Sequence, residues 1–350
     1  MRSLHARPRW PCSAARLACH GPENRYRRIM LTTVITILPV FLIVAAGYAA
    51  GRLKLLGPDA TSILNRFVIW LALPCLLFEI VATTDWDRLW NTRFVLVSVV
   101  GSLLVFGLGL IVGRLRGLEL QDSVIDGLNA GYANASYAGF PLLLLVIGPV
   151  TKPYVTIVGT LTLMTLFGVA IVLMEMARHQ GHGLGRGLRR AGIGILRNPV
   201  LIGPLLGTLW WLTGVPLPHP VESAVSLLGN AASPAALVAI GLFLAQRPLV
   251  QTAANRFVGA LTVLKLIVHP AITAVLAWYV FVLPPQIATI AIALAALPTG
   301  TGPFMITEFY ARDGKVTAGT ILATTLASVI TLAAILSLLG IGVGMTAKSG

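Results

Sequence analysis

Two short stretches of small and polar residues interrupt long apolar runs, and they decide the expected fold. The first reads Gly131-Tyr132-Ala133-Asn134-Ala135-Ser136-Tyr137-Ala138-Gly139-Phe140-Pro141, and the second reads Leu297-Pro298-Thr299-Gly300-Thr301-Gly302-Pro303. Proline removes a backbone donor and clashes with the preceding helical turn, whereas glycine tolerates an unwound backbone. Each stretch therefore predicts a break inside an otherwise apolar helix.

The composition around these breaks indicates that lipid is the main solvent. Of the 350 residues, 56% are hydrophobic and 11% are charged, whereas soluble domains have roughly 25% charged residues. We therefore expect an all-α polytopic membrane protein in contact with a lipid bilayer. The net charge is +14, but the basic residues occupy short loops without interleaved aromatic residues, so nucleic acid is not an expected partner.

Ten apolar runs are long enough to cross a bilayer with some tilt. The two breaks fall in the fourth and ninth runs. The expected transmembrane helices are 32–51, 61–83, 93–114, 122–148, 153–176, 198–214, 221–245, 256–282, 286–310 and 316–342.

These helices divide the chain into four expected parts. They are a basic arm at 1–29, a first five-helix repeat at 30–176, a basic loop at 177–197 and a second five-helix repeat at 198–345. The arm is expected either to be disordered or to precede a true start at Met30.

Lys and Arg residues are distributed unevenly between the two sets of loops. With ten crossings, and with residues 1–29 left out, one set carries thirteen basic residues and the other carries four. Cytoplasmic loops are enriched in Lys and Arg, so the basic loops are predicted to be cytoplasmic and both termini to lie outside. Seven arginines in 1–29 would then lie outside, which favours a start at Met30; a translocated arm is the alternative.

The two halves of the chain show weak internal similarity. A shift of 160 aligns 38–78 with 198–238 and places Pro39 on Pro199, Pro58 on Pro218 and Pro74 on Pro234. Because five helices is an odd number, the two copies would enter the membrane from opposite sides. Such inverted repeats are typical of secondary transporters; chance similarity between apolar segments is the alternative.

Matched breaks in two repeats point to a central substrate site. Backbone groups freed within hydrocarbon need partners, and the N-terminal ends of half-helices favour an anion. Proline kinks packed by small residues are the alternative. The candidate substrate-binding residues at the breaks are Asn134, Ser136, Gly139, Pro141, Pro298, Thr299, Gly300, Thr301 and Pro303.

Lys265 is a further candidate for the substrate site. It lies well inside the eighth expected helix, four residues before His269 on the same helical face. An unpaired buried ammonium is costly, so Lys265 is expected to meet a carboxylate or an anionic substrate; a side chain that extends to the cytoplasmic edge is the alternative.

No metal site or cofactor is expected, apart from a coupling ion, H⁺ or Na⁺. Cys12, Cys19 and His20 match no zinc-binding spacing.

Several short motifs, in their order along 30–345, resemble the auxin efflux carrier family in its bacterial branch. They include Leu73-Pro74-Cys75-Leu76-Leu77-Phe78, Gly139-Phe140-Pro141 and Ser233-Pro234-Ala235-Ala236-Leu237. The resemblance implies two inverted five-helix repeats, a scaffold domain and a transport domain, with broken fourth and ninth helices that cross at the midplane. It places Asn134, Pro141, Pro298 and Pro303 at this crossing.

The same resemblance implies transport of an organic anion, such as malonate or an auxin-like acid, across a bacterial inner membrane. It also implies a homodimer formed through the scaffold. We therefore expect an alternating-access permease without enzymatic activity. A cation/proton antiporter of similar fold is one alternative, although neither break has a nearby carboxylate. A membrane-embedded enzyme is another, although the expected helices offer no convincing pair of catalytic groups.

Overall fold

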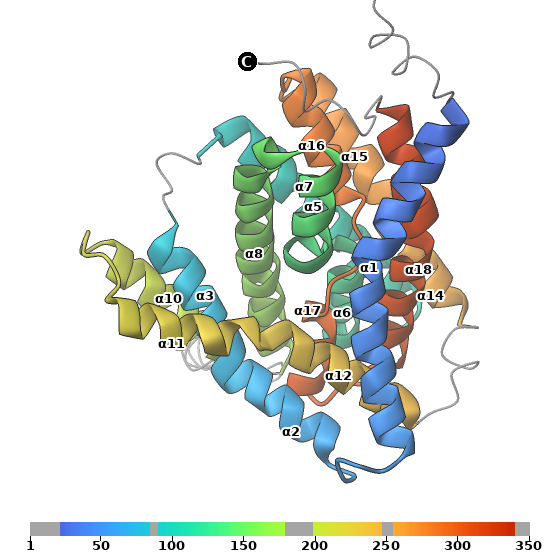
Figure 1. Ribbon diagram of the computed structural model, residues 1–350. Coiled ribbons are helices and arrows are strands. Elements are labelled where there is room, and N and C mark those ends of the chain that lie inside the picture. The colour runs from blue at the N-terminus through green and yellow to red at the C-terminus, as the bar shows by residue number, and fades with distance from the viewer. Residues whose placement is uncertain (1–21, 85–89, 179–198, 247–254, 340–350) are drawn as a thin grey trace, which may run out of the picture.

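The computed structural model describes residues 22–84, 90–178, 199–246 and 255–339 (Figure 1). Within these ranges the regular secondary structure is helical, apart from one isolated β-bridge between Ala133 and Thr299. Cys12, Cys19, His20 and most of the basic loop at 177–197 lie outside the described residues.

The first half of the chain forms helices that correspond to the first five expected runs. Helix α1 begins at Pro22, ahead of the expected start at residue 32. The elements are α1 (Pro22–Arg52), α2 (Ala60–Phe67), η1 (Val68–Ala72), α3 (Leu73–Thr83), α5 (Thr92–Leu115), α6 (Leu120–Gly131), η2 (Ala135–Gly139), α7 (Phe140–Val146), η3 (Pro149–Thr151) and α8 (Lys152–Arg178).

The second half also contains long helices, shorter helices and an interrupted helix. Its elements are α10 (Pro199–Trp211), α11 (His219–Asn230), α12 (Ala232–Ala245), α14 (Arg256–Val263), η4 (Leu264–Val268), α15 (His269–Val275), η5 (Leu276–Val280), α16 (Pro285–Ala295), α17 (Gly302–Phe309) and α18 (Lys315–Leu338).

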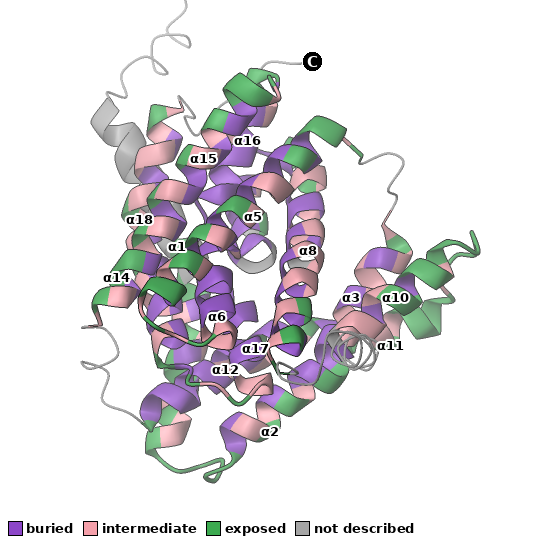
Figure 2. Ribbon diagram, turned by 180° about the vertical axis from the view of Figure 1, so that it is seen from behind, coloured by how far each residue is buried: buried purple, intermediate pink, exposed green. Residues whose placement is uncertain are grey.

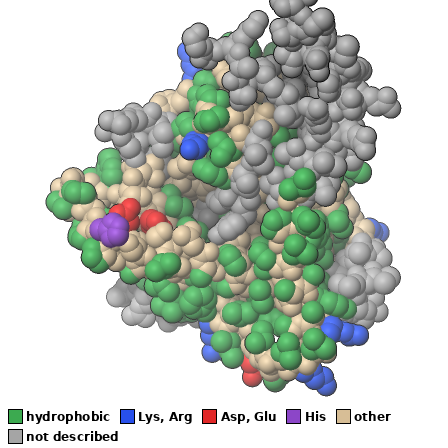
Figure 3. Space-filling view, in the orientation of Figure 1, with side chains coloured by type: hydrophobic (Ala, Val, Ile, Leu, Met, Phe, Trp, Pro, Cys, Tyr) green, Lys and Arg blue, Asp and Glu red, His purple; other side chains and the backbone are tan. Residues whose placement is uncertain are grey.

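Six helical stretches of the described chain are long and apolar enough to cross a membrane, judged by length and composition. They are Ala60–Thr83, Thr92–Leu115, Pro149–Arg178, His219–Ala245, Arg256–Val280 and Lys315–Leu338. Large apolar side chains such as Trp70, Leu71 and Leu326 are exposed, and hydrophobic side chains cover much of the described part of the face in Figure 3. Apolar surface of this extent fits contact with lipid.

The helices form two groups, and Figure 1 shows α10, α11 and α12 of the first group running across the molecule below α5 and α7 of the second. In the first group, α1 packs along α12, and α10 and α11 pack along α3. Close approach in this group depends on glycine, because a Cβ on Gly241 of α12 would lie 2.6 Å from the backbone nitrogen of Tyr48. The second group contains α5, α6, α7, α8, α14, α15, α16, α17 and α18.

The second group contains both interrupted helices. Helix α6 ends at Gly131 before η2 begins at Ala135, and α16 ends at Ala295 before α17 begins at Gly302. Figure 2 shows buried residues concentrated along α6, α8 and α17 in the interior. The interruptions therefore lie in the protein interior, where irregular backbone is tolerated in a membrane protein.

Candidate functional site

The interruptions in the two broken helices meet at the bridge between Ala133 and Thr299. The amide of Asn134 donates to the carbonyl oxygen of Pro298 at 2.9 Å, and the amide of Gly300 donates to that of Tyr132 at 3.2 Å. We call this contact the backbone bridge. It brings Asn134, Pro298, Thr299 and Gly300 together, and each segment supplies hydrogen-bond partners that the other lost when its helix unwound.

Thr299 anchors the backbone bridge to neighbouring helices. Its amide donates to the Thr324 hydroxyl on α18 at 3.1 Å, and its own hydroxyl donates to the Asn129 carbonyl on α6 at 2.8 Å. The Asn129 amide group in turn donates to the Thr317 hydroxyl at 3.1 Å. Thr299 is fully buried, so its side chain positions the bridge.

A small cavity adjoins the backbone bridge, between the two groups of helices. Its free volume is about 30 Å³, room for little more than one water molecule. The second group contributes Tyr132, Asn134, Ala135, Phe167, Thr301, Gly302 and Met305, and the first group contributes Leu73, Leu76, Ala232 and Ser233. We call this the bridge cavity.

The chemistry of the bridge cavity suits a small anion with an apolar part. None of its described lining residues is charged, and its polar side chains are those of Asn134, Ser233 and Thr301, with the phenol of Tyr132. Helical structure begins at Ala135 and at Gly302, both of which line the cavity. The N-terminal end of a helix carries partial positive charge and unpaired N–H groups, which favour an anion.

The Ser233 hydroxyl is a polar group whose position suggests a ligand. Ser233 is 2% exposed, and its Oγ has no hydrogen-bond partner within the described structure. Buried polar groups are normally paired, so a ligand or water in the bridge cavity is the natural partner of this hydroxyl.

The remaining candidates from the two breaks lie in or beside the helices that flank the bridge. Gly139 is buried in η2, where a Cβ would lie 2.6 Å from the Leu297 side chain, and Pro303 is buried in the first turn of α17. Ser136 and Pro141 belong to η2 and α7, but their side chains are outside the described structure.

Lys265 does not line the bridge cavity. Its side chain is fully buried, which does not fit the alternative of extension to the membrane surface. Its Nζ donates to the Ala295 carbonyl oxygen at 2.7 Å and lies 3.1 Å from His269 Nδ1. The expected contact with a carboxylate side chain is not found among the described residues.

Of the residues that line the cavity, only Asn134 and Thr301 were sequence candidates; the residues that were missed include Tyr132, Phe167 and Ser233. The rings of Tyr132 and Phe167 stack with their centroids 5.3 Å apart, and both line the cavity. The internal similarity could have drawn attention to Ser233, because the shift of 160 that aligns Pro74 with Pro234 also aligns Leu73 with Ser233. No sequence pattern distinguishes Phe167, because aromatic residues are common in apolar helices.

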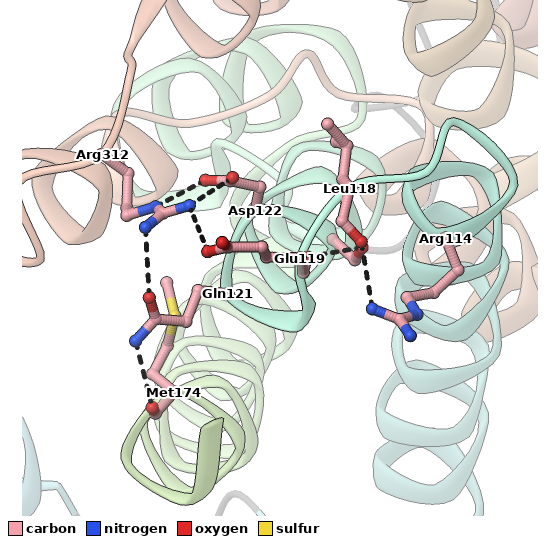
Figure 4. A network of polar contacts seen from close by, with 8 residues as sticks. Arg114, Leu118, Glu119, Gln121, Asp122, Met174 and Arg312 are labelled. Carbon is pink, nitrogen blue, oxygen red and sulfur yellow. Dashed lines mark hydrogen bonds and ion pairs between the residues drawn. The ribbon is translucent and has the colours of Figure 1, made fainter. Parts of the chain in front are cut away.

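A network of ion pairs joins the broken helices at a second place (Figure 4). Arg312, in the connection between α17 and α18, donates through Nε to Asp122 Oδ1 at 2.7 Å and through Nη2 to Glu119 Oε2 at 3.0 Å. Its Nη1 also donates to Gln121 Oε1 at 3.3 Å. The hydrogen bonds that Arg312 donates to the Asp122 carboxylate raise the pKa of Arg312 above its ordinary value. The network therefore ties the end of α17 to the start of α6.

Comparison with known proteins agrees with the resemblance seen in the motifs. A family model described as "Membrane transport protein" matches residues 32–183 and 187–336. A Rhizobium meliloti (strain 1021) protein named "Putative malonate transporter" is 30% identical over 310 residues, which are 87% of this chain and 95% of the relative.

Two more distant relatives come from other organisms. The "Uncharacterized transporter YfdV" of Escherichia coli (strain K12) is 25% identical over 81% of this chain and 92% of its own length. The "Auxin efflux carrier component 8" of Arabidopsis thaliana is 22% identical over 79% of this chain and 89% of its own length. The family model covers most of the chain, so this protein belongs to the membrane transport protein family.

Proposed function

We propose that this protein is a secondary active transporter that moves a small organic anion across the bacterial inner membrane by alternating access. The substrate is a carboxylate such as malonate or an auxin-like acid. The observation that carries the proposal is the bridge cavity, where two broken helices meet and two helical N-terminal ends face one uncharged pocket. The names of the relatives from Rhizobium meliloti and Arabidopsis thaliana support this substrate class.

The proposed architecture has ten crossings in two inverted five-helix repeats. The first helix group would be the scaffold, which would also form a homodimer, and the second group would be the transport domain. Leu73 and Ser233, which the shift of 160 aligns, both line the bridge cavity. This similar placement of aligned residues supports the repeat.

The proposed orientation has basic loops in the cytoplasm and both termini outside. Three of these loops come together, because Arg116, Asn255 and Arg312 line one cavity. Helix α1 begins and α18 ends at the opposite end of the molecule from the connection between α1 and α2 (Figure 1). These positions support loops of one kind on one side of the membrane.

The size and position of the bridge cavity support alternating access. A carboxylate substrate is larger than the free volume of about 30 Å³, so it must be admitted by movement of one wall. One wall belongs to α3 and α12 and the other to the broken helices. Relative movement of the two helix groups would therefore open the cavity.

The rival cation/proton antiporter would be expected to carry acidic side chains at this point. The described lining of the bridge cavity contains no Asp or Glu. We therefore favour an anion substrate.

Thermal unfolding of the purified protein with a panel of ligands tests the proposal. The panel contains malonate, other mono- and dicarboxylates, indole-3-acetate and sodium. A ligand that binds only the folded state at a hundredfold excess over Kd stabilises it by about 2.7 kcal/mol. We expect a carboxylate to stabilise the protein and sodium alone to have no such effect.

Two serine variants locate the binding site. Ser233→Ala should weaken carboxylate binding about tenfold, because one hydrogen bond is lost. The matched control is Ser328→Ala, which removes a buried hydroxyl that donates to Thr325 within α18 at 2.8 Å. Stabilisation by sodium but by no carboxylate would overturn the proposal in favour of the antiporter.

A further inference from the structure

Lys265 and His269 form a buried basic pair on the far side of the backbone bridge from the bridge cavity. Tyr132 and Asn134 line the bridge cavity, whereas Ala133 between them lines a second, smaller cavity together with His269, Ser102 and Ala295. Neighbouring residues of extended backbone point in opposite directions. A single segment of backbone therefore separates the anion cavity from the surroundings of the pair.

The contacts of the pair allow it to hold one positive charge. Lys265 Nζ donates to the carbonyl oxygen of Ala295, the last residue of α16, where helical carbonyls lack partners. An ammonium can only donate hydrogen bonds, so His269 Nδ1 accepts when Lys265 is charged. His269 Nε2 lies 3.5 Å from the Ser102 hydroxyl. A second proton on Nδ1 would point at the ammonium, so the pair accommodates one charge.

The acidic residues on the helices around the pair form ion pairs with arginines. Helices α5, α6, α14, α15 and α18 pack against η4, and α16 contributes the Ala295 carbonyl. Asp126 pairs with Arg116, and Asp122 pairs with Arg312. The charged or titratable residues of these helices within the described structure are Arg93, Arg114, Asp122, Asp126, Arg256, His269 and Lys315.

His269 is the one of these groups that has a hydrogen-bond contact with Lys265 in the described chain. The charge on the pair is therefore stabilised by a carbonyl and an imidazole, without a carboxylate. A buried charge without a counter-charge is costly. An anion that binds nearby would lower this cost, and it would therefore favour the protonated form of the pair.

We propose that the Lys265–His269 pair is a proton-binding site that couples the movement of one proton to that of the anion. This inference rests on the proposed function. A proton on the pair places positive charge behind the backbone bridge and favours an anion in the bridge cavity. By linkage, the bound anion favours the proton to the same extent. Sodium does not suit this site, because hard cations bind oxygen ligands and the pair offers nitrogen.

The test uses the wild-type protein in liposomes that contain a pH-sensitive dye, with radiolabelled malonate outside. Potassium and valinomycin hold the membrane potential at zero, and the interior is made alkaline. A gradient of one pH unit should drive about tenfold accumulation of malonate, because one coupled proton contributes one factor of ten. The dye should report acidification that depends on malonate, and protein-free liposomes measure leakage of the undissociated acid.

Two variants assign the effect to the pair. Lys265→Met should lose accumulation driven by the gradient, and exchange of malonate at equal pH measures how far the missing charge weakens anion transport. Lys152→Met, which removes an exposed lysine at the start of α8, should accumulate malonate like the wild type. If Lys265→Met does not fold, Lys265→Arg is used, because its permanent charge should also abolish accumulation.

The possible outcomes test proton coupling, its assignment to this pair and the proposed function separately. Malonate movement in the wild type that ignores the pH gradient would overturn proton coupling and leave the transporter intact. Accumulation that persists in the folded Lys265 variant would overturn the assignment to this pair. If the wild type moves no malonate and no carboxylate of the panel binds, the proposed function fails and the coupling fails with it.

Discussion

The backbone amide of Asn134 donates a hydrogen bond of 2.9 Å to the carbonyl oxygen of Pro298. These residues come from different halves of the chain, and each belongs to a segment where a helix is interrupted. Neither interruption can satisfy its backbone alone in a setting that excludes water. The two halves must therefore be assembled before either broken helix is stable.

Loss of the Thr324 hydroxyl should destabilise the backbone bridge. This hydroxyl accepts the hydrogen bond from the Thr299 amide, so Thr324→Val leaves a buried amide without a partner and should cost about 1–3 kcal/mol. Thr320→Val is the control, because the Thr320 hydroxyl bonds only to the Val316 carbonyl of its own helix among the described contacts. Thermal or denaturant unfolding in detergent compares the two, and equal losses would contradict the anchoring role.

Two glycines of α5 should respond oppositely to alanine. A Cβ on Gly109 would lie 2.6 Å from the Asp126 carbonyl oxygen and 2.9 Å from the Gly127 Cα, whereas a Cβ on Gly107 would meet nothing within 4 Å. Gly109→Ala should force α5 and α6 apart at a cost of about 1–3 kcal/mol. Gly107→Ala should stabilise the helix by roughly 0.5–1 kcal/mol. A neutral Gly109→Ala in unfolding measurements would show that this interface is looser than described.

The ion-pair network of Arg312 should contribute measurably to stability, unlike an exposed pair in the same connection. Arg312→Gln removes two-point contact with partly buried Asp122 and should cost about 1–2 kcal/mol, less at high salt. Lys315→Gln removes a pair with Asp313 in which both side chains are more than half exposed, so its effect should be near zero. A double-mutant cycle with Asp122→Asn measures the coupling, and a value near zero would refute the prediction.

The proposed orientation can be tested by cysteine labelling of a variant without Cys12, Cys19 and Cys75. Leu55→Cys lies in the exposed connection after α1, and Lys152→Cys lies at the exposed start of α8. A membrane-impermeant maleimide should label position 152 on intact spheroplasts and position 55 only on inverted vesicles, because basic loops remain in the cytoplasm. The reverse pattern would invert the topology.

Much of the architecture was predictable because its physical causes are local. Apolar runs of bilayer length predict helices, and the described chain is helical apart from the isolated bridge and its connections. Proline and glycine at 131–141 and 297–303 predict interruption, and the helices stop at Gly131 and Ala295. Family membership was also predictable, because the order of short motifs survives along the chain.

The surroundings of individual side chains were less predictable. Lys265 was expected to meet a carboxylate or a substrate, but it contacts the Ala295 carbonyl and His269. The periodicity of a helix predicts that Lys265 and His269 share a face. It does not predict that the C-terminal end of α16 packs against that face.

The sequence alone determined the lipid-embedded helical class, the two interruptions and the transporter family, since hydropathy, proline chemistry and motif order are properties of neighbouring residues. Tertiary structure decided the rest. It joined Ala133 to Thr299, brought Ser233 of the first helix group and Thr301 of the second to one cavity, and put Lys265 behind the bridge. These contacts depend on how distant helices pack, and packing is set by the shapes of all the side chains between them.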